Sequence, residues 1–188
     1  MGVRQSFVRI TAEQLAELEQ IAIEHSSLSY AEISPQLYQV LDRRSHLQQY
    51  TMVPLDKLSP EQAYYKFTIE KSYWSLLEDL MVQLIRDQVV DWWPIHEDYP
   101  VHIGDLWPCY SYIYLIFHHE LAPLLDLLQH VPYEQLKQAF DADFAEFTDM
   151  TVEEKQGVYN VVLSCLDSIR IMAQQAHAAN ESIIWYIS

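Results

Sequence analysis

The sequence predicts an α+β fold, a helix-rich single domain with a small sheet that includes the first and last segments of the chain. Residues 3–10 (VRQSFVRI) and 182–187 (SIIWYI) are short and rich in β-branched and aromatic residues, as strands are. Between them, apolar residues recur mainly at spacings of three and four, which is typical of helices packed on a core. A chain of 188 residues has room for one core, so we expect residues 1–188 to form one domain with its terminal strands paired.

Two capping boxes mark helix starts. Thr11 is followed three residues later by Gln14, and Thr151 in the same way by Glu154, so each pair can exchange two hydrogen bonds across a first turn. The first box predicts a helix that runs to about residue 26. The second opens the longest helix, with apolar residues at spacings of three and four and Asn180 as its C-terminal stop.

Proline and hydrophobic spacing predict the remaining elements. Ser-Pro pairs at 34–35 and 59–60 predict two helix starts, because proline is favoured in the first turn. Residues 89–109 contain three prolines that each follow an aromatic residue, which predicts irregular, extended backbone. The other expected elements are a central helix at 68–88, a strand at 110–117, helices at 121–129 and 133–140, and a short amphipathic turn at 144–147.

The chain is strongly acidic, with 27 Asp and Glu against 11 Lys and Arg and a formal net charge of −16. Residues 91–149 hold eleven of the acidic residues against one basic residue, Lys137. Proteins that bind nucleic acids or anionic membranes need clustered cations, so the charge argues against both partners. A basic protein is the partner that this region would attract, although excess acid also promotes solubility without any partner.

Missing motifs exclude several classes of catalytic and cofactor site. The three glycines lie far apart, which rules out glycine-rich phosphate and dinucleotide loops. No serine lies in a nucleophile elbow, and Cys109 and Cys165 are too far apart for a metal-binding pair. The chain also lacks a signal-peptide core and any apolar run of the roughly 20 residues that span a bilayer, so we expect a cytoplasmic protein. We assign no catalytic residue, metal or cofactor.

Several stretches also match a known family in order and pattern. They are an N-terminal strand after Met-Gly, IEKSYWSLL at 69–77, the helix pair at 119–125 and 133–141, and the ending NESIIWYI at 180–187. Together they resemble the YfbM-like family, small bacterial proteins that carry a domain of unknown function. The resemblance covers most of the chain, although only HIGD at 102–105 corresponds to the family's glycine-rich stretch. It implies an α+β fold with the terminal strands together and supplies no catalytic residues.

The irregular stretch is one candidate site. Long loops carry function more often than structure, and ligand sites favour apolar walls. The aromatic residues that would line a small-molecule pocket there are Trp92, Trp93, Trp107 and Tyr112. The alternative is a loop that fills the core. Five histidines between residues 96 and 130 lack zinc-site spacing, and the neighbours His118 and His119 point apart on any regular element, so no metal site is assigned.

The segment 140–149 is the second candidate site. If Phe140, Phe144 and Phe147 face inward, the acidic residues between and after them form an outward ridge that suits a basic protein. The residues of this expected ridge are Asp141, Asp143, Glu146 and Asp149. The alternative is a solvated surface without a partner.

Two functions therefore remain open. The favoured one is a non-enzymatic interaction protein that binds a basic protein, in the manner of a small acidic inhibitor or immunity protein. The other is a small-molecule-binding protein or enzyme that uses the aromatic region at 92–117. The sequence indicates neither the partner's identity nor the oligomeric state.

Overall fold

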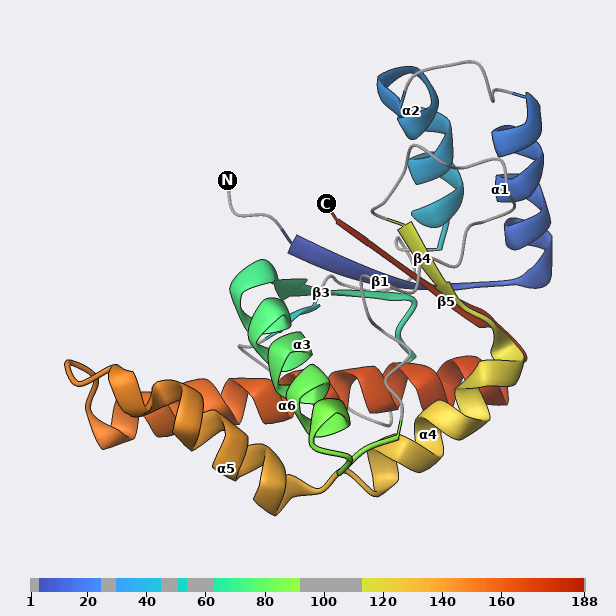
Figure 1. Cartoon of the computed structure of the whole chain (residues 1–188). Helices are drawn as coiled ribbons and strands as arrows, with labels where there is room; N and C mark the ends of the chain where they lie inside the picture. Colours follow the sequence, from blue (N-terminus) through green and yellow to red (C-terminus); the bar gives the residue numbers. More distant parts are fainter. Residues whose placement is uncertain (1–3, 25–29, 45–50, 54–62, 92–112, 188) are drawn as a thin grey trace.

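The computed structural model describes residues 4–24, 30–44, 51–53, 63–91 and 113–187. Within these residues, five strands form one sheet, and helices cover both of its faces (Figure 1). The expected α+β class is confirmed, and both terminal strands belong to the sheet. No helix in the described part of the chain combines the length and the apolarity that crossing a membrane requires.

The first and last strands are neighbours in the middle of the sheet, whose order is β2-β3-β1-β5-β4. Strand β1 (Arg4–Ile10) runs antiparallel to β5 (Ser182–Ile187), and their register places Gln5 opposite Ile187. The first and last described segments of the chain therefore lie side by side, as Figure 1 shows. This pairing confirms the sequence prediction that the terminal strands lie together.

Three further strands complete the sheet. Strand β3 (Lys66–Glu70) pairs antiparallel with β1, and β4 (Ile113–Ile116) pairs antiparallel with β5. The short edge strand β2 (Thr51–Val53) runs parallel to β3. The sequence pattern predicts β4, within the longer range 110–117, but neither β2 nor β3.

A row of aromatic rings crosses the sheet and forms the centre of the larger core. Phe7 of β1 lies opposite both Phe67 of β3 and Trp185 of β5, and its ring stacks on Phe67 at 4.8 Å between centroids. Trp74 lies against this row, 5.4 Å from Phe7 and 5.2 Å from Trp185. All four side chains are buried. Each such ring pair contributes about 0.5–1.5 kcal/mol beyond its area burial.

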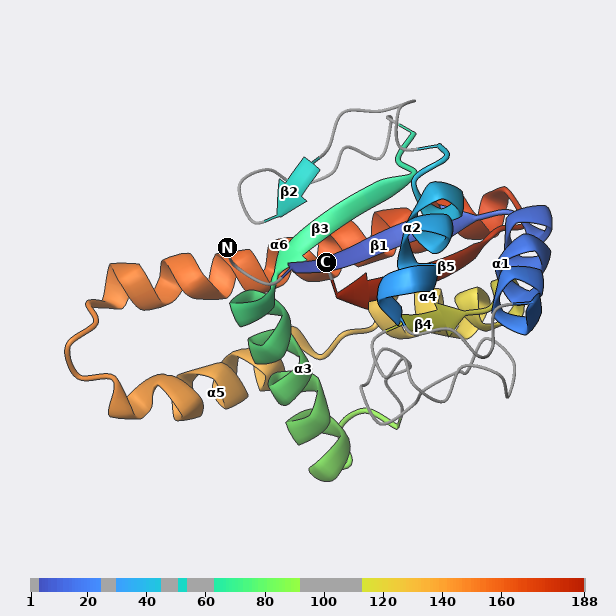
Figure 2. The same ribbon diagram turned by 90° about the horizontal axis from the view of Figure 1, so that it is seen from above.

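The helices divide between the two faces according to the alternation of the strands. Phe7 points toward one face, while Val8 and Ile10 point toward the other. The helices that bury their apolar residues against the Phe7 face are α3 (Lys71–Arg86), α4 (Leu121–Gln129), α5 (Tyr133–Asp143) and α6 (Val152–Ala178). The opposite face is covered by α1 (Ala12–Glu24) and α2 (Tyr30–Leu41) (Figures 1 and 2).

Both expected capping boxes are present. At the start of α1 the Thr11 amide donates to Gln14 Oε1 at 3.1 Å, and the Gln14 amide donates back to Thr11 Oγ1 at 3.2 Å. At the start of α6 the Thr151 amide donates to Glu154 Oε2 at 2.7 Å, and this bond lowers the pKa of the Glu154 carboxyl. Asn180 follows α6 with φ of 56°, the left-handed conformation that ends helices.

The prediction of a helix at 68–88 is wrong at its N-terminal end. Residues 68–70 belong to β3, and α3 starts only at Lys71, directly after the strand. Ile69 fits the apolar spacing of the helix, but in the structure it pairs opposite Gln5 of β1 and lies fully buried. Spacing within the segment cannot reveal a strand whose partner lies some sixty residues away. Tertiary pairing therefore overrides the local pattern.

The helix start expected at Ser34-Pro35 is also wrong. Helix α2 begins at Tyr30, so Pro35 lies inside it rather than in its first turn. Proline has no amide hydrogen and therefore removes one backbone hydrogen bond here. The burial of Ile33, Leu37 and Val40 against the sheet compensates for this loss. The second Ser-Pro pair, at 59–60, lies outside the described residues.

A buried charge network secures β1 to β5 at the end where β5 begins. Arg9 Nε donates to Glu181 Oε2 at 2.7 Å, and Arg44 Nη1 donates to Glu181 Oε1 at 2.6 Å. The side chains of Arg9 and Glu181 are only 7% and 9% exposed. Arg9 Nη1 also donates to the Tyr64 carbonyl and to Gln175 Oε1 of α6. One guanidinium thus connects β1 with α6, β5 and the residues before β3.

We expect Glu181→Ala to destabilise the protein strongly, because it leaves the buried Arg9 guanidinium without its carboxylate. The loss is about 3–5 kcal/mol in the free energy of unfolding, the range for breaking a buried ion pair. Urea unfolding monitored by tryptophan fluorescence measures it, with the exposed residue change Glu153→Ala as the control. A loss no larger than that of the control would show that the ion pair contributes nothing net.

Gln5 is a polar residue in an apolar place. It lies in the central strand β1 and is fully buried, and neither its Nε2 nor its Oε1 has a hydrogen-bond partner among the described residues. Gln14 is a matched contrast, since it is also buried but donates through Nε2 to the Val40 carbonyl at 3.0 Å. An unsatisfied buried polar group costs about 1–3 kcal/mol.

We therefore expect the same substitution to have opposite effects at these two positions. Gln5→Met removes two unsatisfied atoms with little change in volume and should raise the free energy of unfolding by about 1 kcal/mol. Gln14→Met breaks both the bond to Val40 and the capping-box bond from the Thr11 amide, and should lower it by about 1–2 kcal/mol. Paired urea titrations test both variants. Destabilisation by Gln5→Met would mean that the Gln5 amide is satisfied in solution.

Candidate functional site

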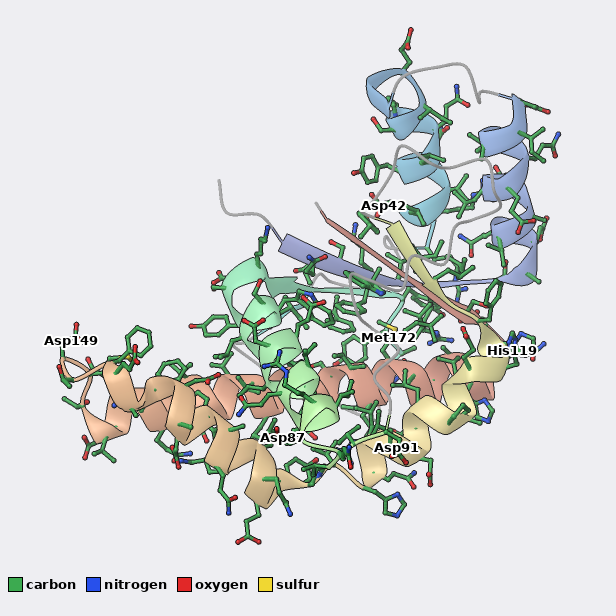
Figure 3. All side chains as sticks on the ribbon, in the orientation of Figure 1. Asp42, Asp87, Asp91, His119, Asp149 and Met172 are labelled. Atoms are coloured by element: carbon green, nitrogen blue, oxygen red, sulfur yellow. The ribbon has the colours of Figure 1, made fainter. Side chains whose placement is uncertain are left out.

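Helices α5 and α6 form a hairpin whose closed end extends beyond the sheet (Figures 1 and 2). The connection consists of the 3-10 helix η3 (Phe144–Glu146) and a turn at 148–149. The Thr151 capping box then fixes the direction in which α6 leaves the turn. We call residues 141–154 the tip, and Figure 3 shows Asp149 at its end.

A series of aromatic rings supports the tip from inside. Phe140 of α5 is buried and tilted against Tyr159 of α6 at 5.1 Å, which holds the two helices together. Phe144 stacks on Phe140 at 4.3 Å, and Phe147 lies 5.1 Å from Phe144. Burial falls along the series, since Phe144 is half-buried and Phe147 is 49% exposed. The last ring therefore presents apolar surface to solvent.

An open groove of about 320 Å³ lies where the tip meets the first turns of α3. Its walls are largely apolar, and its lining residues are Ser72, Tyr73, Leu76, Asp143, Phe144, Phe147 and Val158. Three elements contribute to it, because α3, the η3 region and α6 converge here. Among the described residues that line the groove, the only charged group is the carboxylate of Asp143, at the edge of an acidic surface.

That surface is the ridge of Asp141, Asp143, Glu146 and Asp149, whose side chains are all exposed. Residues 141–154 include six acidic residues and no Lys or Arg. Among the described residues, Asp141 pairs with Lys137, whereas no ion pair is formed by Asp143, Glu146 or Asp149. The ridge therefore carries an uncompensated negative charge beside an apolar groove.

The two lysines closest to the ridge in sequence are directed toward the hairpin. Lys137 Nζ lies 5.7 Å from the Phe140 ring centre and 5.3 Å from that of Tyr159, and Lys155 Nζ donates to the Phe144 carbonyl at 2.7 Å. Burial, and then the negative charge of Asp141, raise the pKa of Tyr159. Its hydroxyl therefore stays protonated and donates to the Tyr133 carbonyl of α5.

The structure does not describe the aromatic candidate site. Trp92, Trp93, Trp107 and Tyr112 lie outside the described residues. Of the five histidines, the structure describes three, and His130 Nδ1 is bonded to the Asp126 carbonyl of its own helix. No group of three or more His, Cys, Asp or Glu side chains in the described residues could hold a metal ion.

A second cluster of charged side chains lies far from the tip, where Asp42 appears in Figure 3. Lys66 Nζ bonds to Asp42 Oδ1 at 2.6 Å and to the Tyr186 hydroxyl at 2.7 Å. Burial by itself would lower the pKa of Lys66, but Tyr186 and Asp42 together raise it. Lys66 is thus a charged lysine with partners on two elements, and this arrangement is typical of a structural ion pair. The sequence contains no local signal for this cluster.

Comparison of the chain with models of known families, with curated proteins and with solved structures found no match. The resemblance to the YfbM-like family stays a prediction. The candidate site is therefore defined by geometry and charge alone.

Cys165 lies in the middle of α6 and is fully buried. Burial raises the pKa of its thiol to about 12. The thiolate is the reactive form, and at pH 8 the buried thiol stays protonated. The position is a core position rather than a reactive one.

We expect Cys165 to resist thiol reagents until the protein unfolds. In a Cys109→Ser variant, which leaves Cys165 as the single cysteine, a disulfide reagent at pH 8 should react at the rate of unfolding. Adding urea beyond the unfolding midpoint should expose the full equivalent of thiol. Rapid reaction without urea would show that α6 opens locally or that the thiol is accessible.

Proposed function

We propose that this protein is a non-enzymatic interaction module that binds a basic protein through the ridge, as small acidic inhibitors and immunity proteins do. The observation that carries the proposal is that three of the four ridge carboxylates have no compensating cation among the described residues. Asp143, Glu146 and Asp149 are exposed and have no ion-pair partner among the described residues. Net stability does not require such a cluster, because like charges on one surface repel.

A paired carboxylate elsewhere on the described surface shows what the tip lacks. Glu17 on the α1–α2 side makes a bidentate contact with Arg43. This bond lowers the pKa of Glu17 and raises that of Arg43. At the tip Lys137 pairs with Asp141 and lies against two aromatic rings, while Lys155 donates to a backbone carbonyl, so neither lysine pairs with the other three ridge carboxylates. A partner's Lys and Arg would supply the missing counter-charges and steer the encounter.

We expect neutralisation of the ridge to weaken binding to a cationic probe. The variant is D141N/D143N/E146Q/D149N, and the probe is a fluorescently labelled lysine homopeptide followed by anisotropy. At about 50 mM salt, where the Debye length exceeds 10 Å, the variant should bind about fivefold or more weakly than the unaltered protein. The difference should shrink when the salt is raised to about 300 mM.

The control is a variant with the same change in net charge at residues outside the tip. Glu13→Gln, Glu19→Gln, Asp87→Asn and Asp91→Asn neutralise four exposed carboxylates on α1 and beyond the C-terminal end of α3. Figure 3 shows Asp87 and Asp91 apart from the tip. The control should lose less than about twofold, since only a local cluster makes strong contacts. Equal losses of affinity in both variants would show that net charge alone determines binding, and would contradict the proposal.

A further inference from the structure

We propose that the groove beside the ridge receives a large apolar side chain from a cationic amphipathic helix of the partner protein. This inference rests on the proposed function and adds the chemistry of the partner. The ridge alone would accept any basic surface, whereas a ridge beside an apolar groove selects a segment that has both features. Helices that lay an apolar face into a groove are a common mode of peptide recognition.

The size of the groove fits an anchoring side chain. A cavity of about 150 Å³ already accommodates benzene, so the 320 Å³ here have room for one aromatic or two aliphatic side chains of a partner. Tyr73, Leu76, Phe144 and Val158 are all half-buried, and each therefore retains apolar surface that a partner can cover. Phe147, which is 49% exposed, gains most from being covered.

The polar groups of the groove argue against a small molecule as its occupant. Ligand pockets combine apolar walls with several convergent polar groups that fix the orientation of the ligand. In this lining the charged or hydroxyl-bearing side chains are Ser72, Tyr73 and Asp143, and the groove is open to solvent. Among the described lining residues only the Asp143 carboxylate has a charge, and it favours a cation. A partner segment that has a cationic side chain next to an apolar anchor can contact both the apolar wall and the Asp143 carboxylate at its edge.

The charge also argues against a second copy of this chain. A symmetric pair formed through this face would place each ridge against its own copy, because a two-fold interface uses the same patch on both subunits. Asp143, Glu146 and Asp149 would then meet like charges without compensating lysines. A partner helix with Lys or Arg beside its apolar residues meets the same surface with opposite charge. Apolar residues at spacings of three and four would place its anchor in the groove.

The test compares two labelled peptides of identical composition. One has Lys and Leu arranged on opposite faces of a five-turn helix of about 18 residues, and the other has the same residues scrambled. We expect the unaltered protein to bind the amphipathic peptide about tenfold more tightly than the scrambled one, as a buried anchor at the centre of an interface would give. Fluorescence anisotropy measures both dissociation constants.

Two substitutions alter the groove in opposite ways while sparing the core. Phe147→Ala removes an exposed part of its wall, and Ser72→Phe fills it from an exposed position in the first turn of α3. Each should remove most of the tenfold preference and leave binding of the scrambled peptide unchanged. Val152→Ala is the matched control, because Val152 is 79% exposed at the tip but does not line the groove. Thermal melts check that all three variants fold.

The outcomes separate this inference from the proposed function. Equal binding of the two peptides, or an unchanged preference in both groove variants, overturns the inference. The proposed function survives that result if D141N/D143N/E146Q/D149N still weakens binding of both peptides. An uncharged amphipathic peptide that binds as tightly as the cationic one contradicts both proposals. A dimer in sedimentation that dissociates on Phe147→Ala identifies a second copy as the occupant and also overturns the inference.

Discussion

The fold depends on the pairing of the first strand with the last. Strands β1 and β5 are adjacent interior strands, and the register between them places Phe7 against Trp185 at the centre of the larger core. Arg9 and Glu181 join the same two ends through a buried ion pair, although 172 positions separate them in the sequence. Closing so long a loop carries an entropic cost before any contact repays it. The sheet is therefore complete only when the last residues of the chain are in place.

Helix α6 connects the paired terminal strands with the candidate site. Gln175, near its C-terminal end, accepts a hydrogen bond from the buried Arg9 guanidinium, while Val158, near its N-terminal end, lines the groove. The two positions are about 25 Å apart along a helix that rises 1.5 Å per residue. The buried residues between them pack against α3, α4 and the sheet. Helix α6 thus connects the tip continuously to the core.

Charged side chains are arranged differently around Glu181 and at the tip. Around Glu181 every cation that the structure describes has a carboxylate, a carbonyl or an aromatic ring as partner. Because these groups are buried, they need well-aligned partners to offset the cost of desolvation. At the tip the carboxylates are solvated, and Asp143, Glu146 and Asp149 make no ion pair with described residues. Buried pairing maintains the fold, whereas the exposed, unbalanced charge at the tip is the surface that we propose a basic partner binds. The groove contributes the apolar surface that exposed charge alone lacks.

Local signals in the sequence determined much of this protein. The capping boxes at Thr11 and Thr151, the strand 182–187 and the acidic composition of the tip can all be recognised from neighbouring residues, because their physics acts within a turn or a strand. Only the tertiary structure decided that Ile69 belongs to a strand and that Pro35 lies inside a helix, since both depend on packing against distant segments. The groove depends on tertiary structure in the same way. Its walls come from α3, η3 and α6, and no pattern along one segment shows where three elements meet.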